Sequence, residues 1–278
     1  MPADTIEPVT MTGTSVSGIC VEIGGMAVEF QSAHPHLREI LEDRYRGFSN
    51  PEATPQWQFT VDVVDGGTRP DPGQDLEVEN EAGRWRLRRG DFYAEIDSRT
   101  RRGWIRQSAN PYSLDSFLRI VHSLTLAKCG GFLRHAASAV RNGKAFLFAG
   151  VSGAGKTTIS RCAPPDARLL TDEISYVRSA AGGFEAYGTP FAGELARLGE
   201  NRSAPVAELF FLAQGPENRI EPVGPMDAVR LLLRNILFFA HDQELVGLVF
   251  DSACEFVRKV PARKLVFLPD SRVWELIG

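Results

Sequence analysis

The segment from Gly150 to Thr157 has the residue types and the spacing of a phosphate-binding loop. It reads Gly-Val-Ser-Gly-Ala-Gly-Lys-Thr and satisfies the pattern G-x-x-x-x-G-K-[ST]. In such loops the backbone N–H groups and a lysine hold the phosphates, while a Ser or Thr hydroxyl binds Mg²⁺. The sequence therefore predicts ATP on this loop, with Lys156 on the β- and γ-phosphates and Thr157 on Mg²⁺. The expected nucleotide contacts are Gly150, Val151, Ser152, Gly153, Ala154, Gly155, Lys156, Thr157 and Thr158.

An acidic pair, Asp172-Glu173, follows a short apolar stretch, Arg168 to Thr171. Acidic pairs at turns are commonly solvated surface, but two carboxylates at the end of a strand shortly after a phosphate loop favour a function. Carboxylates there can hold Mg²⁺ or take a proton from an acceptor hydroxyl. Neighbouring strand residues point to opposite sides, so we expect two different roles. We hypothesise that Glu173 takes the proton from the acceptor hydroxyl and that Asp172 helps to hold Mg²⁺, and the reverse assignment stays open.

A histidine is expected beside the loop. Asn142-Gly143 separates two apolar runs and signals a tight hairpin turn, so Ala136–Val140 should be antiparallel to Ala145–Ala149, the strand before the loop. This arrangement differs from the parallel neighbours of ordinary P-loop enzymes. It puts His135 at the start of the partner strand, where it could reach the reacting phosphate. A lone histidine is also commonly a core or hinge residue.

These three elements together resemble the HPr kinase/phosphorylase family, and more closely the HPr-kinase-like relatives found with peptide-modifying enzymes. The resemblance rests on Arg134-His-Ala-Ala137, on the loop from Gly150 to Thr158 and on Asp172-Glu173. The interval from His135 to Gly150 is fifteen positions (150 minus 135), as in that family. The resemblance is firm over roughly residues 130 to 200 and holds for the rest of the chain only in outline.

The resemblance implies a P-loop kinase domain with a phosphoenolpyruvate-carboxykinase-like nucleotide fold. It implies ATP and Mg²⁺ as cofactors and phosphate transfer to a serine hydroxyl of a peptide or small protein. Two alternatives remain: a kinase of a free small molecule such as an amino acid, and a non-catalytic ATP-sensing module. The signature that accompanies the reverse phosphorolysis is not recognisable, which favours a one-way kinase.

The resemblance also assigns residues. The candidate catalytic residues are His135, Lys156, Asp172 and Glu173, and the candidate metal ligands are Thr157 and Asp172. The family carries paired aspartates, so its usual aspartate base is a glutamate here, and Ser152 matches the loop serine that contacts free phosphate. The family has a further catalytic glutamate where Gly188–Glu194 lies, but the sequence differs there, which argues against a Mg²⁺ role for Glu194.

The elements that must position these residues indicate an α/β fold of the α+β, mixed-sheet kind. We expect a β-rich N-terminal domain over 1–110, a connecting helix over 111–131 that Ser113 caps and Gly130-Gly131 ends, and a nucleotide-binding domain over 132–278. Antiparallel strands should fill 19–106, with a loop over 64–73. In the last domain we expect helices over 156–162, 226–239 and 243–258, and a hairpin of 207–212 with 219–222.

Composition narrows the class of protein. The 278 residues are 43% hydrophobic and carry a formal net charge of -4, which disfavours nucleic acid as a partner. The N-terminus lacks the pattern of a secretory signal, no apolar run is long enough to span a membrane, and the four cysteines are widely spaced. We therefore expect a cytoplasmic protein without a membrane partner, and homo-oligomers are possible. The arginine-rich stretches over 84–89 and 99–102 are assigned to a solvated face.

Overall fold

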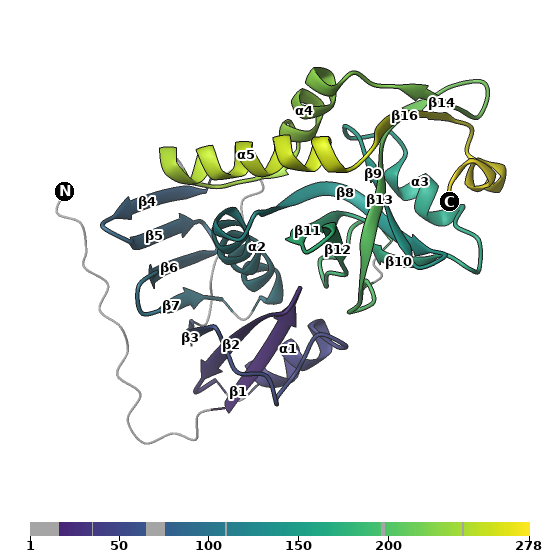
Figure 1. The fold of residues 1–278 in the computed structure, drawn as a ribbon. Coiled ribbons are helices and arrows are strands. Elements are labelled where there is room, and N and C mark those ends of the chain that lie inside the picture. The colour runs from purple at the N-terminus through teal and green to yellow at the C-terminus, as the bar shows by residue number, and fades with distance from the viewer. Residues whose placement is uncertain (1–16, 35, 65–75, 109, 196–197, 241) are drawn as a thin grey trace. The chain divides into compact units, whose positions relative to one another are not determined.

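The computed structural model describes residues 17–34, 36–64, 76–108, 110–195, 198–240 and 242–278. The chain divides into two compact units between Ser116 and Phe117. Each unit combines a mixed sheet with helices, so the fold is mixed α/β of the α+β kind (Figure 1). The division lies inside helix α2 (Pro111–Lys128), in the region for which the sequence predicted a connecting helix.

The first unit contains a seven-stranded sheet in the order β1-β2-β3-β7-β6-β5-β4. Its elements are β1 (Ser17–Ile23), β2 (Met26–Ser32), α1 (Leu37–Arg44), β3 (Trp57–Val63), β4 (Glu77–Glu81), β5 (Arg84–Arg89), β6 (Phe92–Asp97) and β7 (Arg102–Gln107). The expectation of a wholly antiparallel sheet was wrong, because β3 is parallel to both β2 and β7. Helix α1 and strands β4 to β6 supply the connections that parallel pairs need. Of the predicted loop over 64–73, all but Val64 lies outside the described residues.

Helix α2 begins at Pro111, the first residue of the predicted segment 111–131, but Ser113 does not cap it. The side-chain oxygen of Asn110 accepts a hydrogen bond from the Tyr112 N–H at 3.0 Å, and Pro111 occupies the first turn, where its missing N–H costs nothing. Ser113, the predicted cap, instead donates its hydroxyl proton to Asp91 at 2.7 Å. After the helix Gly130 has a φ of 70°, so the predicted end of the helix at this glycine is confirmed.

The second unit contains a nine-stranded sheet and four short or medium helices among its described residues. Its strands are β8 (Gly131–Arg141), β9 (Lys144–Ala149), β10 (Arg168–Thr171), β11 (Ile174–Ala180), β12 (Gly183–Tyr187), β13 (Ser203–Gln214), β14 (Arg219–Pro222), β15 (Ile236–Leu237) and β16 (Ala262–Phe267). Its helices after α2 are α3 (Lys156–Arg161), α4 (Pro225–Leu233), α5 (Gln243–Lys259) and the 3₁₀ helix η1 (Ser271–Leu276).

The predicted hairpin before the loop is confirmed. Arg141 lies opposite Lys144, and Asn142 and Gly143 both have positive φ angles, 51° and 73°, as a two-residue turn requires. On its other edge β9 pairs in parallel with β13. The strand that leads into the glycine loop therefore has one antiparallel and one parallel neighbour.

Two long strands change partners along their length. The first half of β8 pairs with β11, and the second half pairs with β9 and β10. The start of β13 pairs with β12, and the rest pairs with β9 and β16. Because β11 also pairs with β12, the pairings β8–β9–β13–β12–β11 return to β8 and close a circuit. This circuit brings the end of β9 and the start of β11 to the same strand, β8.

Two sequence-based predictions in this unit were wrong. The helix expected over 226–239 ends at Leu233, because Ile236 and Leu237 pair with β8 and the Arg134 guanidinium donates to the carbonyls of Leu231 and Leu232. These bonds satisfy carbonyl groups at the end of α4. The expected hairpin of 207–212 with 219–222 is not formed, since β16 lies between β13 and β14 and pairs with both.

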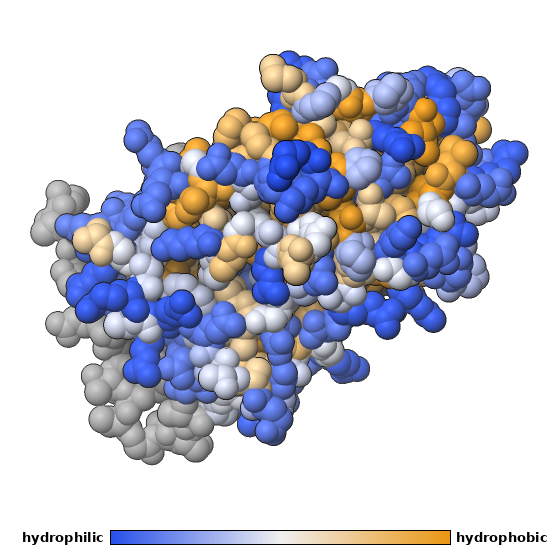
Figure 2. Space-filling model, in the orientation of Figure 1, coloured by the Kyte–Doolittle hydropathy of each residue, from blue (hydrophilic) through white to orange (hydrophobic). Residues whose placement is uncertain are grey.

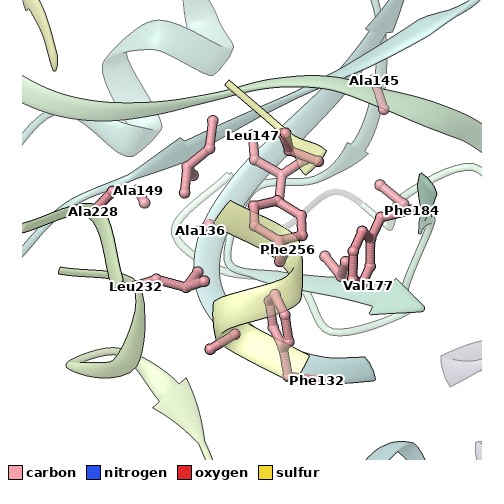
Figure 3. Close-up of a cluster of buried hydrophobic side chains, with 14 of the residues drawn as sticks. Phe132, Ala136, Ala145, Leu147, Ala149, Val177, Phe184, Ala228, Leu232 and Phe256 are labelled. Carbon is pink, nitrogen blue, oxygen red and sulfur yellow. The ribbon is translucent and has the colours of Figure 1, made fainter. Parts of the chain in front are cut away.

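The central strands are buried on both faces, which explains their continuous apolar runs. One face packs against α4 and α5, where Phe256 contacts the rings of Phe132 and Phe184 at centroid distances of 5.4 and 5.0 Å (Figure 3). The other face packs against α3 and η1. Consecutive residues of β9 alternate between the two cores, so the strand before the loop is held from both sides.

Polar residues cover most of the face of the molecule that Figure 2 draws, with apolar residues in patches between them. In the first unit the arginines of β5 alternate with buried residues, and Arg86 lies 3.7 Å from Glu79 and 3.6 Å from Glu81. Such exposed pairs fit a solvated face. None of the helices in the described ranges is long and apolar enough to cross a membrane.

We expect Trp274→Ala to lower the free energy of unfolding of the second unit by about 3–5 kcal/mol. The Trp274 ring is 2% exposed and contacts Phe148, and its N–H donates to the Ile159 carbonyl at 3.1 Å, which fixes η1 against α3. Leu276→Ala is the matched control, because Leu276 lies in the same turn but is 41% exposed, and its loss should stay within about 0.5 kcal/mol. Urea unfolding followed by circular dichroism measures both, and equal losses would contradict this packing.

Candidate functional site

A cavity of about 430 Å³ lies in the second unit where the glycine loop meets β8 and the turn between β10 and β11. It brings together all four candidate catalytic residues: His135, Asp172 and Glu173 lie outside the loop, and Lys156 belongs to it. Ala154 is the one predicted loop contact that does not line the cavity. The full lining is His135, Gly150, Val151, Ser152, Gly153, Gly155, Lys156, Thr157, Thr158, Asp172, Glu173, Gly193, Glu194 and Asn235.

Close packing fixes the shape of the loop. Gly155 has a φ of 106°, and a Cβ there would meet the Phe267 ring at 2.6 Å, so only glycine fits. A Cβ on Gly150 would meet the Cβ of Ala154 at 2.5 Å. The Gln214 side chain, at the end of β13, donates to the Gly153 carbonyl at 2.8 Å. The loop is therefore held by its own glycines and by the ends of β13 and β16.

Lys156 folds back over the loop. Its ammonium group donates to the carbonyls of Gly150 at 3.1 Å and Val151 at 3.3 Å. Burial lowers the pKa of Lys156, and the negative charges of Glu173 and Glu194 partly offset that shift. The lysine thus lies between the loop and the acidic side of the cavity.

Asp172 and Glu173 lie in the turn between β10 and β11 rather than within a strand. The Thr171 hydroxyl oxygen accepts from the N–H groups of Glu173 at 3.2 Å and Ile174 at 3.1 Å, which shapes this turn. The Glu173 carbonyl accepts from the Ala136 N–H of β8 at 2.9 Å. The two side chains have different partners, as the sequence analysis expected, but the turn rather than the alternation of a strand separates them.

The Asp172 carboxylate holds the segment 193–195. Its two oxygens accept from the backbone N–H groups of Gly193 and Leu195, each at 2.9 Å, and the residue is 4% exposed. This segment carries Glu194, whose carboxylate accepts a hydrogen bond from the Thr157 hydroxyl at 3.0 Å. The side chain next to Thr157 is therefore Glu194, and Asp172 acts on it through the backbone. Contact of Asp172 itself with Mg²⁺ stays a prediction.

Glu173 faces an arginine that the sequence analysis did not identify. The guanidinium of Arg119, from α2, lies 3.3 Å from a carboxylate oxygen of Glu173. The same guanidinium packs over the Phe191 ring at 5.0 Å from its centroid. Arg119 was missed because it lies within the predicted helix, between apolar residues. Its position in the sequence forms no motif that would indicate a site.

His135 lies between the acidic turn and Asn235. It pairs with Ile174 of β11. On the other edge of β8 its backbone N–H donates to the backbone carbonyl of Asn235 at 2.9 Å. Burial lowers the pKa of His135 below its usual value, and the charges of Arg119, Lys156 and Arg134 lower it further. These surroundings favour the uncharged imidazole. Asn235 was missed because the sequence indicated a helix across it.

The residues present fit a magnesium ion only if other ligands complete its shell. Among the described residues, no group of three or more His, Cys, Asp or Glu side chains could hold a metal ion by itself. The pair formed by Thr157 and Glu194 offers one hydroxyl and one carboxylate. Mg²⁺ in phosphate sites takes one or two carboxylates together with phosphate oxygens and water, so the pair fits such a shared site.

The sequence model of a protein family described as SynChlorMet cassette protein ScmC matches residues 111–278. The match begins at the first residue of α2 and includes the whole lining of the cavity as well as Arg119. A search of the curated proteins finds no match.

We expect Asp172→Asn to loosen the segment 193–195. Asparagine keeps one acceptor oxygen and replaces the other with an NH₂ group, so either the Gly193 or the Leu195 amide loses its acceptor. Hydrogen bonds to charged groups contribute about 1.5–3 kcal/mol, so that amide should exchange its proton about 10 to 150 times faster. Hydrogen exchange followed by NMR measures this. Glu173→Gln, at the adjacent acid, is the control and should leave both amides unchanged. Unchanged exchange in Asp172→Asn would show that its carboxylate does not hold the segment.

Proposed function

The chain belongs to the SynChlorMet cassette protein ScmC family, and we propose that it is an ATP- and Mg²⁺-dependent kinase that phosphorylates a serine hydroxyl of a peptide or small protein. One observation carries the proposal. A single cavity joins the Gly150–Thr157 loop to Glu173, Glu194 and His135. Phosphoryl transfer needs a phosphate cradle, a metal position and a proton acceptor at one place, and in this proposal these groups would supply all three.

The loop would bind the triphosphate. Lys156 is the lysine of this loop, and its ammonium contacts the carbonyls of Gly150 and Val151. In the proposed complex Lys156 exchanges these carbonyls for phosphate oxygens, which are stronger acceptors. The Gly155 conformation turns the backbone at this point, so that N–H groups of the loop can face the phosphates.

The carboxylate proposed for the metal is Glu194. Thr157 and Glu194 would hold Mg²⁺ from the protein side, and the ion would neutralise charge on the β- and γ-phosphate oxygens when bound. Asp172 has a positioning role in this account, because its oxygens hold the backbone on both sides of Glu194. Removing Asp172 would then weaken metal binding indirectly.

Glu173 is proposed as the general base. Its side chain is 32% exposed at the cavity, so an acceptor hydroxyl could approach it. His135 is the second polar group on that side, and as a neutral imidazole it could donate a hydrogen bond to the transferring phosphate or accept one from the acceptor. Strand β8 places Glu173 relative to Lys156, because it pairs with β11, which follows Glu173, and with β9, which leads into the loop that carries Lys156.

The finer fold assignment is part of the proposal. The resemblance of Arg134-His-Ala-Ala137, the loop and the acidic pair to HPr-kinase-like proteins supports a P-loop kinase domain of the HPr kinase and phosphoenolpyruvate carboxykinase type. The antiparallel β8–β9 hairpin before the loop supports the same assignment. A serine of a peptide or small protein is proposed as the acceptor on this resemblance.

We expect Lys156→Ala to weaken ATP binding about 10- to 150-fold, because a charge-assisted contact worth about 1.5–3 kcal/mol is lost. Lys144→Ala is the matched control, since Lys144 is an exposed lysine at the start of β9, the strand that leads into the loop, and does not line the cavity. Titration calorimetry with ATP and Mg²⁺ measures both variants. Equal affinities for Lys156→Ala and the wild type would remove the loop as the nucleotide site.

Glu173→Gln and Glu194→Gln should fail in different ways. Glu173→Gln keeps the shape and removes the proton acceptor, so the transfer rate should fall roughly 10²- to 10⁴-fold with ATP affinity retained. Glu194→Gln should instead raise the Mg²⁺ concentration needed for half-maximal rate. Transfer of labelled phosphate from ATP, measured across a Mg²⁺ titration, separates the two effects. Wild-type rates in both variants would contradict the assignment of roles.

A further inference from the structure

Arg119 makes two contacts that join separate parts of the site. Its guanidinium lies 3.3 Å from a carboxylate oxygen of Glu173, and the same group packs over the Phe191 ring. Phe191 is 1% exposed and begins the stretch that leads to Glu194. The Arg119 side chain is itself 22% exposed, so solvent screens this ion pair only in part.

We propose that Arg119 is a positioning residue for phosphoryl transfer, which fixes Glu173 for proton acceptance and couples it to the segment that carries Glu194. The inference rests on the proposed function. It goes beyond that function because Arg119 lies outside the cavity lining and outside the motifs that indicated a kinase.

The geometry supports this role in two ways. An ion pair on one carboxylate oxygen restricts the rotamer of Glu173, and a base must be held in a narrow range of positions to accept a proton efficiently. The Phe191 ring then limits the guanidinium in turn, at a cation–π distance. Together with the Asp172 bonds to Gly193 and Leu195, Arg119 ties the acidic turn and the 191–195 segment into one unit.

The charge of Arg119 also reaches His135. The cations whose charges act on His135 are Arg119 from α2, Lys156 from α3 and Arg134 from β8 itself. Glu173 lies on the neighbouring turn. Arg119 is the first of the three cations that lower the pKa of His135, after burial. Removing its charge should therefore raise the pKa of His135, and this change can be measured without any phosphate transfer.

The test uses the full-length protein with Arg119→Gln and Arg119→Lys, each made alone and together with Glu173→Gln. Arg178→Gln is the matched control. Arg178 also packs over an aromatic ring, that of Tyr187 at 5.1 Å, but it does not line the cavity. Free L-serine and serine-containing peptides serve as acceptors with labelled ATP. Calorimetry gives the ATP affinity, and NMR gives the His135 titration.

We expect Arg119→Gln to lower kcat about 5- to 100-fold with little change in ATP affinity. Arg119→Lys should restore part of the rate, because it keeps the charge but not the planar fork. In the Glu173→Gln background Arg119→Gln should have no further effect, because Arg119 acts through Glu173. The His135 titration should move to higher pH in Arg119→Gln and stay in place in Arg178→Gln.

Three results would overturn the inference. An unchanged kcat in Arg119→Gln, with the wild type active, rejects the role of Arg119 and leaves the kinase proposal intact. Full additivity with Glu173→Gln shows that Arg119 acts elsewhere. A wild type that binds ATP but labels no acceptor rejects the proposed function, and this inference with it. The NMR titration of His135 in the same samples shows whether the variants are folded.

Discussion

The site depends on the pairing of one strand, β8. Backbone N–H and C=O groups inside a protein must be paired, and β8 meets this requirement with β11 and β15 along its first half and with β9 and β10 along its second. The change of partners occurs at His135 and Ala136. The acidic turn therefore lies on one side of this point, Asn235 lies on the other, and β9 leads to the glycine loop from the same strand. No side-chain contact is needed to bring these groups together.

Side-chain interactions then set the distances within that frame. The Asp172 carboxylate accepts hydrogen bonds from two backbone N–H groups, which holds Glu194 next to the Thr157 hydroxyl. Glu173 forms an ion pair with Arg119, and the negative charges of Glu173 and Glu194 act on the loop lysine, Lys156. The buried guanidinium of Arg134 donates hydrogen bonds to the carbonyls of Leu231 and Leu232 at the end of α4. This arrangement keeps Asn235 next to β8.

Local signals in the sequence predicted the parts of the site that are close together in the chain. The glycine loop, the Asn142-Gly143 turn and the apolar stretch before Asp172 each have a pattern of a few residues, because turn geometry and burial act over that range. The roles of Asp172 and Glu194 could not be separated in this way. Their relation depends on hydrogen bonds between residues about twenty positions apart, and no local pattern encodes these. Arg119 and Asn235 were missed for the same reason.

The strand arrangement shows the same limit. The sequence indicated β14 correctly, but its partner is β16, which follows it by some forty residues, rather than the adjacent β13. Parallel pairs in the first unit were missed as well, since alternation of apolar residues gives the strand but not the direction of its neighbour. The helix expected across Asn235 had suitable spacing and was interrupted by tertiary pairing with β8.

In the proposed reaction the γ-phosphate of ATP moves to a hydroxyl in this cavity. The most direct measurement incubates the protein with ATP labelled at the γ-phosphate, Mg²⁺, serine peptides of varied sequence and free L-serine, and identifies the products by mass spectrometry. We expect equal amounts of ADP and labelled phosphoserine, with neither formed in excess EDTA. Intact ATP, or ADP with labelled inorganic phosphate and no labelled acceptor, would contradict it.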